Sequence, residues 1–236
     1  MWQKTRNELH PKGLEIVTIA LDVDPDAARA WLNPVNPNHP SLIDSAHVVD
    51  QMLGVINVPN SVWIDENGMI VRPAEPAWPD RDAPPDWQKM ADDPSIPAQL
   101  KETLQLAKGI RTQSKEYMTA LRDWVEKGAK SQYALSSRDV IERSGKRGKA
   151  EAEAAAQFEL GNYLWQSGSK ELAPQHWKEA HRLQPDNWTY KRNAWALADP
   201  FQGPTELYDS CWVNDVRKIG AENYYPALDL RRGSAK

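Results

Sequence analysis

Residues 54–73, GVINVPNSVWIDENGMIVRP, give the clearest indication of fold in this 236-residue chain. Residues 61–65 and 69–72 are rich in β-branched and aromatic side chains, which are typical of strands. Asn67 and Gly68 lie between them, and both tolerate the positive φ angles that a tight turn requires. The stretch therefore predicts two antiparallel strands joined by a short turn.

The segment before this hairpin predicts alternating strands and helices. Residues 14–21, LEIVTIAL, form a nearly continuous apolar run, which is typical of a strand buried on both faces of a parallel sheet. Asp24 is expected to cap a following helix that has Pro25 at its first position. Residues 41–44 predict a second short strand, followed by a helix that Ser45 caps and Gly54 ends.

Residues 13–22, GLEIVTIALD, and residues 54–71 together resemble the thioredoxin-like fold. The closest resemblance is to the TlpA-like (redoxin) branch of bacterial thiol–disulfide proteins. It implies a partial α/β thioredoxin-like domain over residues 1–73, with a cis peptide bond before Pro59. It also implies a backbone edge at Val58, Pro59 and Asn60 that could pair with an extended peptide.

The chain departs from this family at the residues that carry its chemistry. Dithiol exchange requires two cysteines in a Cys-x-x-Cys arrangement, and this chain has one, Cys211. The strand expected before that motif has no counterpart either, so the chain resembles a family member that starts late. We therefore expect residues 14–21 to pair with a replacement strand or with another chain.

A proline-rich strap is expected at residues 74–97. Seven prolines fall in the 25 positions 73–97, together with several aspartates, which is typical of an extended connector. Trp78 and Trp87 are unusual in such a connector, and we expect them to pin it to a neighbouring surface.

The rest of the chain is expected to be helical over residues 98–200, with an irregular tail over residues 201–236. Its apolar periodicity predicts one long helix at 98–127 and later helices at 149–166, 169–183 and 187–198. The pattern at residues 154–187 resembles a tetratricopeptide helix pair. The resemblance rests on Gly161, Leu164, Ala173, Trp177, Ala180 and Pro185. It implies an all-α tetratricopeptide-like region whose peptide groove would include Lys170, Lys178 and Arg182.

Other candidate sites are weaker. Cys211 is a redox candidate, but no histidine lies near it in sequence to act as a base. Asp22, Asp24 and Asp26 begin like a calcium loop, but the glycine and the final acidic residue of such a loop are missing. His39 and His47 lie on either side of an aspartate, and a metal site there would need a further ligand. We predict no catalytic residue, no metal and no cofactor.

Composition excludes several classes of protein. A formal net charge of −4 argues against a nucleic-acid partner, and a single cysteine excludes a disulfide within the chain. No apolar run approaches the length of a membrane span, and the N-terminus has no apolar signal-peptide core. We expect a cytoplasmic location, or a periplasmic or membrane-anchored one if an upstream segment is missing.

Two functions follow from these observations. The first is a redox-inactive, thioredoxin-like module that binds a protein or peptide, or acts as a scaffold, with homo-oligomers left open. The alternative is a thiol–disulfide oxidoreductase or peroxiredoxin-like enzyme whose catalytic cysteine lies upstream of this chain. A Trp-Cys-x-x-Cys sequence just before Met1 would favour the enzyme.

Overall fold

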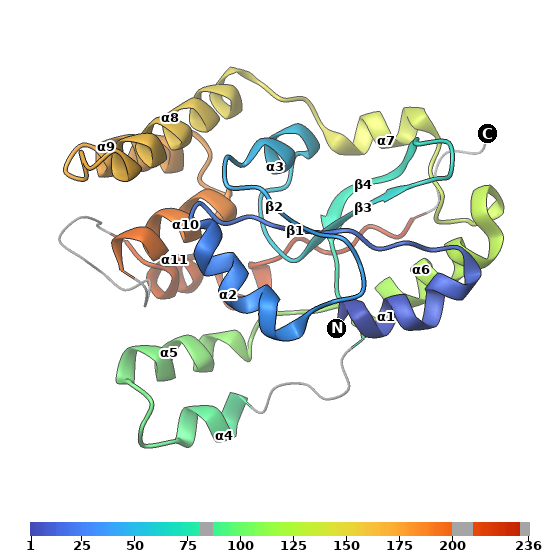
Figure 1. Ribbon diagram of the computed structural model, residues 1–236, viewed down its shortest axis with the longest axis horizontal. Helices are drawn as coiled ribbons and strands as arrows, with labels where there is room; N and C mark the ends of the chain where they lie inside the picture. Colours follow the sequence, from blue (N-terminus) through green and yellow to red (C-terminus); the bar gives the residue numbers. More distant parts are fainter. Residues whose placement is uncertain (81–86, 200–209, 232–236) are drawn as a thin grey trace. The chain divides into compact units, whose positions relative to one another are not determined.

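The computed structural model describes residues 1–80, 87–199 and 210–231 and shows a mostly helical protein (Figure 1). Within these residues the strands form only two sheets, β1–β2 and β3–β4, of two strands each. The expected fold class, a partial thioredoxin-like α/β domain followed by an all-α tetratricopeptide-like region, is therefore wrong. Two short, separate sheets cannot supply the central layer that helices cover in an α/β fold.

The chain forms two compact units, and each combines stretches that are far apart in sequence. Unit 1 consists of Met1–Asp82, Gln113–Lys146 and Ala227–Lys236, and unit 2 consists of Ala83–Thr112 and Arg147–Pro226. The domain boundaries expected near residues 73, 97 and 200 stay predictions.

The first sheet of unit 1 is smaller and more exposed than its sequence predicts. β1 pairs in parallel with β2, which places Ile19 opposite Leu42. Residues 14–21 were expected to be buried on both faces, which is wrong, because Val17 and Ile19 are 52% and 37% exposed. Only three residues of the run find a partner strand, and in the described chain that partner is β2. The elements here are α1 (Trp2–Leu9), η1 (His10–Lys12), β1 (Thr18–Ala20), α2 (Pro25–Val35), β2 (Ser41–Ile43) and α3 (Val48–Leu53).

Side-chain caps fix the ends of these helices. The Asp24 carboxylate accepts the N–H of Asp26 at 3.0 Å, which confirms the predicted cap of α2. The expected Ser45 cap of α3 is wrong: the Asp44 carboxylate accepts the first two N–H groups of that helix, at 3.1 and 2.7 Å. His47 occupies the N-cap position with a φ of 55°, and Gly54 ends the helix as predicted, with a φ of 74°.

The predicted hairpin is confirmed as β3 (Asn60–Ile64) and β4 (Ile70–Pro76), which pair in antiparallel orientation. Trp63 of β3 is buried against α6 (Ser114–Lys127). Its ring stacks on Trp124 with centroids 5.0 Å apart and meets the edge of Tyr117 at 6.1 Å. These aromatic contacts form the centre of unit 1, with α7 (Ser137–Ser144) packed against β4.

A bulge in this hairpin changes which side chains share a face. Ser61 pairs with Glu75 and Trp63 pairs with Arg72, so two steps along β3 match three steps along β4. Residues three apart on a regular strand point to opposite faces, but an extra residue in the bulge brings them to the same face. Arg72 and Glu75 meet for this reason, and Pro73 between them lies where a missing N–H is tolerated.

The single long helix expected at residues 98–127 is wrong. The structure has α5 (Ala98–Ala107) and then α6, and the break between them coincides with the boundary between the two units. The intervening residues include Gly109, Ile110 and Thr112, which are weak helix formers. The apolar stripe continues across the break, and for this reason the sequence pattern predicts one continuous helix.

One of the two tryptophans of the strap lies among the described side chains. Trp78 is buried, and its carbonyl accepts the Ser114 hydroxyl at 3.0 Å, so the strap is pinned there as expected. The prediction for the Trp87 side chain lies outside what the structure describes.

Unit 2 contains a closely packed helix pair, α8 and α9, that lie side by side (Figure 1). A Cβ atom added to Gly161 of α8 would lie 2.5 Å from the Trp177 ring of α9. Trp177 is fully buried, and its indole N–H donates to Asn162 Oδ1 at 2.9 Å. The two helices therefore approach each other closely at Gly161, where there is no side chain to separate them. The helices of this unit are α4 (Trp87–Asp92), α5, α8 (Lys149–Gln166), α9 (Ala173–Leu183), α10 (Trp188–Ala198) and α11 (Trp212–Ile219).

The tail expected to be irregular contains a helix. α11 buries Trp212, Val213 and Val216, and contacts α5. The Lys191 ammonium of α10 donates to Asp215 of α11 at 2.9 Å, which ties this helix to the unit. The last part of the tail, residues 232–236, lies outside the described residues.

The imidazole of His181 is enclosed in unit 2. Its ring meets the edge of Trp195 at 6.2 Å between centroids, and its Nε2 has almost no exposed surface. Burial lowers the pKa of His181 to about 3, and the nearby Lys191 ammonium acts in the same direction against Asp215. The folded protein therefore holds this histidine neutral at pH values where an unfolded chain would protonate it.

We expect unit 2 to lose stability as the pH falls below 6.5. A pKa that is depressed by folding contributes stability above the ordinary value near 6.5, and the contribution is lost as the pH falls toward the folded-state value. Between pH 7 and pH 5 this loss is about 2 kcal/mol for one histidine. Urea unfolding of His181→Gln should lack this part of the pH dependence, whereas His10→Gln, at an exposed site, should retain it. Equal pH dependence of His181→Gln and the unmodified chain would contradict the prediction.

Candidate functional site

The structure places the residues of the expected peptide edge at the start of the hairpin. The Val58–Pro59 peptide bond is cis, as the resemblance implies. The Pro59 carbonyl accepts the N–H of Ala77 at 3.2 Å, and Asn60 pairs with Pro76. The backbone of this stretch is therefore already paired on one side with β4 and the residue that follows it.

The basic residues expected to line a helical groove belong to unit 2. Lys170 lies over the Trp165 ring at 4.8 Å, and Arg182 donates to Glu179 at 2.6 Å. Lys178 is exposed on α9, one turn before Arg182. The hairpin residues belong to unit 1 and these basic residues belong to unit 2. The peptide-binding role of both groups stays a prediction.

The thiol belongs to unit 2 and the candidate metal ligands belong to unit 1. Cys211 is buried at the N-cap of α11 with 2% of its surface exposed. His39 donates to or accepts from its neighbours in sequence, and His47 Nδ1 lies 2.7 Å from Asp50 Oδ2 in the interior. Among the described residues, no three His, Cys, Asp or Glu side chains come together in a way that could hold a metal ion.

One face of the sheet β1–β2 exposes apolar side chains that were predicted from the sequence to be buried. Val17, Ile19 and Leu42 are 52%, 37% and 53% exposed. Ile19 and Leu42 are paired across the strands, and Val17 lies two residues before Ile19, so the three share one face. We call these three residues the β1–β2 face. Contiguous exposed apolar side chains of this kind mark interaction sites more often than isolated ones do.

The helices that follow each strand also expose apolar side chains. On α2, Trp31 and Val35 are 82% and 69% exposed, although they continue the helical stripe that Ala28 begins in the interior. On α3, Val48 and Met52 are one turn apart and 51% and 77% exposed. The strand–helix segment as a whole therefore leaves much apolar surface uncovered.

This segment is also strongly acidic. Residues 14–71 hold eight acidic side chains and one basic side chain, Arg29, whereas the whole chain is near balance at −4. Arg29 is itself paired with Asp26 at 2.7 Å. The acidic residues are Glu15, Asp22, Asp24, Asp26, Asp44, Asp50, Asp65 and Glu66. Asp44 and Asp50 are buried, and Glu15 is paired with Arg6 at 2.7 Å, so the other five carboxylates are the ones that favour a positively charged partner.

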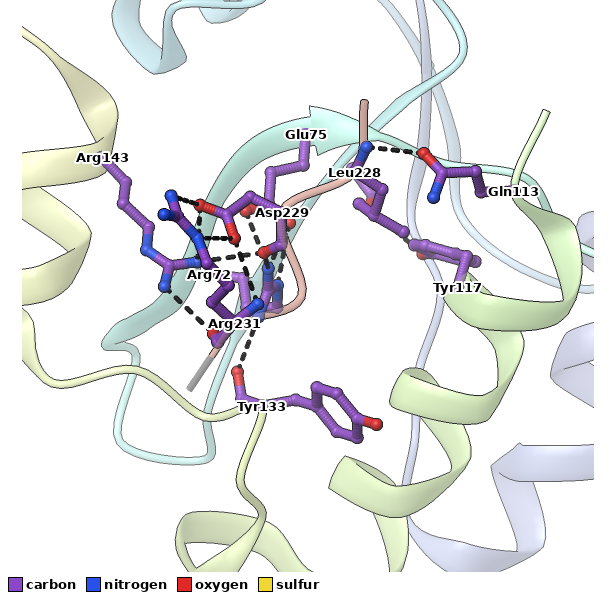
Figure 2. Close-up of polar contacts among 10 residues, drawn as sticks. Arg72, Glu75, Gln113, Tyr117, Tyr133, Arg143, Leu228, Asp229 and Arg231 are labelled. Atoms are coloured by element: carbon purple, nitrogen blue, oxygen red, sulfur yellow. Dashed lines mark hydrogen bonds and ion pairs between the residues drawn. The ribbon is translucent and has the colours of Figure 1, made fainter. Parts of the chain in front are cut away.

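A second candidate site centres on Arg72, which is 1% exposed (Figure 2). Its guanidinium forms a bidentate pair with Glu75, with N···O distances of 2.7 to 2.9 Å, and donates to the Tyr133 carbonyl at 3.0 Å. It also lies over the Trp63 ring, 5.4 Å from its centroid. Burial raises the pKa of Glu75, and the charge of Arg72 acts against that rise. The pair is thus a fixed, neutral anchor.

The same arginine holds a distant part of the chain. Its Nη2 donates to the Asp229 carbonyl at 2.6 Å, and Arg143 of α7 donates to that carbonyl and to the Arg231 carbonyl, both at 3.0 Å. The Leu228 N–H donates to Gln113 Oε1 at 2.7 Å (Figure 2). Residues 228–231 form no helix or strand, so side chains of unit 1 supply their backbone partners. We call Arg72, Arg143 and Gln113 the clamp.

The Asp229 side chain adds an ionic contact at this position. Its carboxylate accepts from Arg231 at 2.6 and 2.8 Å and lies 3.8 Å from Arg143. The Arg231 hydrogen bonds, with the charge of Arg143, hold the pKa of Asp229 well below its usual range. Leu228 is 8% exposed beside it. The clamp therefore holds a leucine, a negative charge and two backbone carbonyls.

No sequence motif marks the clamp. Its residues lie far apart along the chain, and each resembles an ordinary surface side chain in its local context. The only local signal was a charged Arg72 within the apolar strand 69–72, next to a proline that marks a bulge.

Comparison of the chain with protein-family models, curated proteins and solved structures found no match. None of the helices in the described part of the chain is both long and apolar enough to cross a membrane.

Proposed function

We propose that the chain is a protein-binding module that receives an apolar, positively charged segment of another protein on the β1–β2 face. The observation that carries the proposal is the exposure of Val17, Ile19 and Leu42 on one face of a sheet with only two strands in the described chain. A two-stranded sheet is marginal by itself, and a partner would cover its apolar face.

Charge selects among the partners that could cover this face. A second copy would bring the same acidic segment against itself, and an anionic membrane surface would be repelled in the same way. A segment with leucine-like side chains on one side and lysines or arginines on the other satisfies both properties of the surface. Docking requires no chemistry from the module, in agreement with a binding or scaffold role.

The test measures binding of a defined probe by fluorescence anisotropy. The probe is a labelled 14-residue peptide of leucine and lysine with helical amphipathic spacing, compared with an isomer of the same composition without that spacing. We expect the amphipathic peptide to bind more tightly than the isomer, and binding to weaken as salt rises. The double variant Ile19→Ser/Leu42→Ser should bind at least tenfold more weakly, because the charge is unchanged but the apolar contact is lost.

The matched control is Ile141→Ser/Leu160→Ser. It makes the same two replacements at exposed positions of α7 and α8, where the side chains are 72% and 41% exposed. This control should bind the peptide like the unmodified chain. Equal weakening in both double variants, or unchanged binding in Ile19→Ser/Leu42→Ser, would rule out the β1–β2 face as the docking surface.

A further inference from the structure

We infer that the clamp of Arg72, Arg143 and Gln113 is a binding site for extended peptides that contain a leucine–aspartate step, and that residues 228–231 of this chain are its exchangeable occupant. The inference rests on different residues from the proposed function and does not depend on it.

The occupant is held as a peptide ligand is held. One N–H and two carbonyl groups of the segment bond to side chains from three separate places: Gln113 just before α6, Arg72 in β4 and Arg143 in α7. A segment built into a sheet would instead exchange backbone hydrogen bonds with a neighbouring strand. Backbone contacts of this kind accept an extended chain of any sequence, and the side-chain contacts then select among sequences.

Two side chains provide that selection. Leu228 is the buried apolar anchor, with 8% of its surface exposed. The Asp229 carboxylate lies 3.8 Å from the Arg143 guanidinium, whose N–H groups are used on the two backbone carbonyls. Arg143 thus interacts with a negative charge and with main-chain carbonyl groups at the same time. A ligand of this site therefore carries an apolar residue followed directly by an acidic one.

Arg72, the buried member of the clamp, keeps its position without the segment. Arg72 is fixed by Glu75 and by the Tyr133 carbonyl, which both belong to other parts of unit 1. Loss of the segment would leave N–H groups of Arg72 and Arg143 without the carbonyls of Asp229 and Arg231. Buried donors left in this way favour uptake of another chain with carbonyl groups in the same positions.

The occupant itself is lightly anchored. The side chains of Asp229 and Arg231 are 31% and 86% exposed, and their mutual ion pair lies within the segment rather than between the segment and the clamp. Exchange therefore breaks four backbone hydrogen bonds to side chains and uncovers one leucine. A peptide supplied in solution makes the same contacts, but the tethered segment has a high effective concentration, so the peptide binds well only where the chain's own segment is weakened.

The test uses the full chain and a fluorescein-labelled peptide, Pro-Ala-Leu-Asp-Leu-Arg-Arg, which copies residues 226–232. In Leu228→Ser/Asp229→Ser the chain's own segment is weakened, so we expect the labelled peptide to bind at least tenfold more tightly than to the unmodified chain. Adding Arg143→Gln to this variant should weaken peptide binding at least tenfold. A peptide with serine at both selective positions should not bind.

Failure of the peptide to bind Leu228→Ser/Asp229→Ser more tightly than the unmodified chain would overturn the inference. So would unchanged binding after Arg143→Gln. If the double variant does not fold by circular dichroism, Asp229→Asn alone serves, because that side chain is partly exposed, and the same order of affinities is required. Adding Ile19→Ser/Leu42→Ser to Leu228→Ser/Asp229→Ser should leave the affinity for this peptide unchanged, which separates failure of the clamp from failure of the β1–β2 face.

Discussion

Replacing Arg72 by leucine is expected to lower the free energy of unfolding by about 3–5 kcal/mol. The substitution leaves Glu75 without its bidentate partner in the interior of unit 1. It also removes the donors to the Tyr133 and Asp229 carbonyls, at 3.0 and 2.6 Å. An uncompensated buried charge is more destabilising than the loss of the whole pair, so most of the effect comes from the carboxylate left behind.

Urea unfolding at two pH values checks this origin. Burial already raises the pKa of Glu75, and removing Arg72 removes the charge that opposes the rise. A carboxyl whose folded pKa is raised contributes stability below its ordinary pKa and loses it as the pH increases through the folded value. Arg72→Leu should therefore be less destabilising at pH 5 than at pH 7.

Two comparisons complete the test. Arg72→Leu/Glu75→Leu should recover much of the lost stability, since no charge then remains buried. Arg182→Leu breaks an exposed pair with Glu179 and should change stability by less than about 1 kcal/mol. A loss in Arg72→Leu as small as that of Arg182→Leu, or a double variant as unstable as the sum of its single variants, would contradict the prediction.

The parts of the fold that sequence predicts correctly are those fixed by local chemistry. Asn67 and Gly68 set the turn of the hairpin, Asp24 caps α2, and Gly54 ends α3. Each depends on a few neighbouring residues. By contrast, the length and burial of β1 depend on how many strands pair with it, and an apolar run such as 14–21 does not specify that number. The expected α/β fold failed at this step.

The clamp could not be predicted, for a related reason. Arg72 and Asp229 are separated by 157 positions, and Arg143 belongs to a helix with no motif of its own. Even the near neighbours Arg72 and Glu75 would point to opposite faces of a regular strand, and only the bulge brings them together. The exposure of the β1–β2 face could not be predicted for a different reason. Its residues are apolar, and apolar residues in a strand predict a buried face.

Replacing Trp177 by alanine is expected to lower the free energy of unfolding by about 3–5 kcal/mol. This side chain fills the space between α8 and α9 and has no exposed surface. Its loss creates a cavity and leaves the buried Asn162 oxygen without the indole donor at 2.9 Å. The control is Tyr163→Ala, which removes the exposed aromatic side chain next to Asn162 in α8. Tyr163 is 66% exposed, so this substitution should change stability by less than about 1 kcal/mol.

The contact with Gly161 makes a sharper test, because the effect of one substitution should change sign. In the unmodified chain, Gly161→Ala places a methyl group 2.5 Å from the Trp177 ring and should destabilise by about 1–3 kcal/mol. In the Trp177→Ala background the methyl group enters the cavity, and alanine is a better helix former than glycine by about 1 kcal/mol. Gly161→Ala should therefore stabilise the Trp177→Ala chain. A destabilisation of equal size in both backgrounds, measured by urea unfolding, would show that Gly161 is needed for its backbone and not for the approach of Trp177.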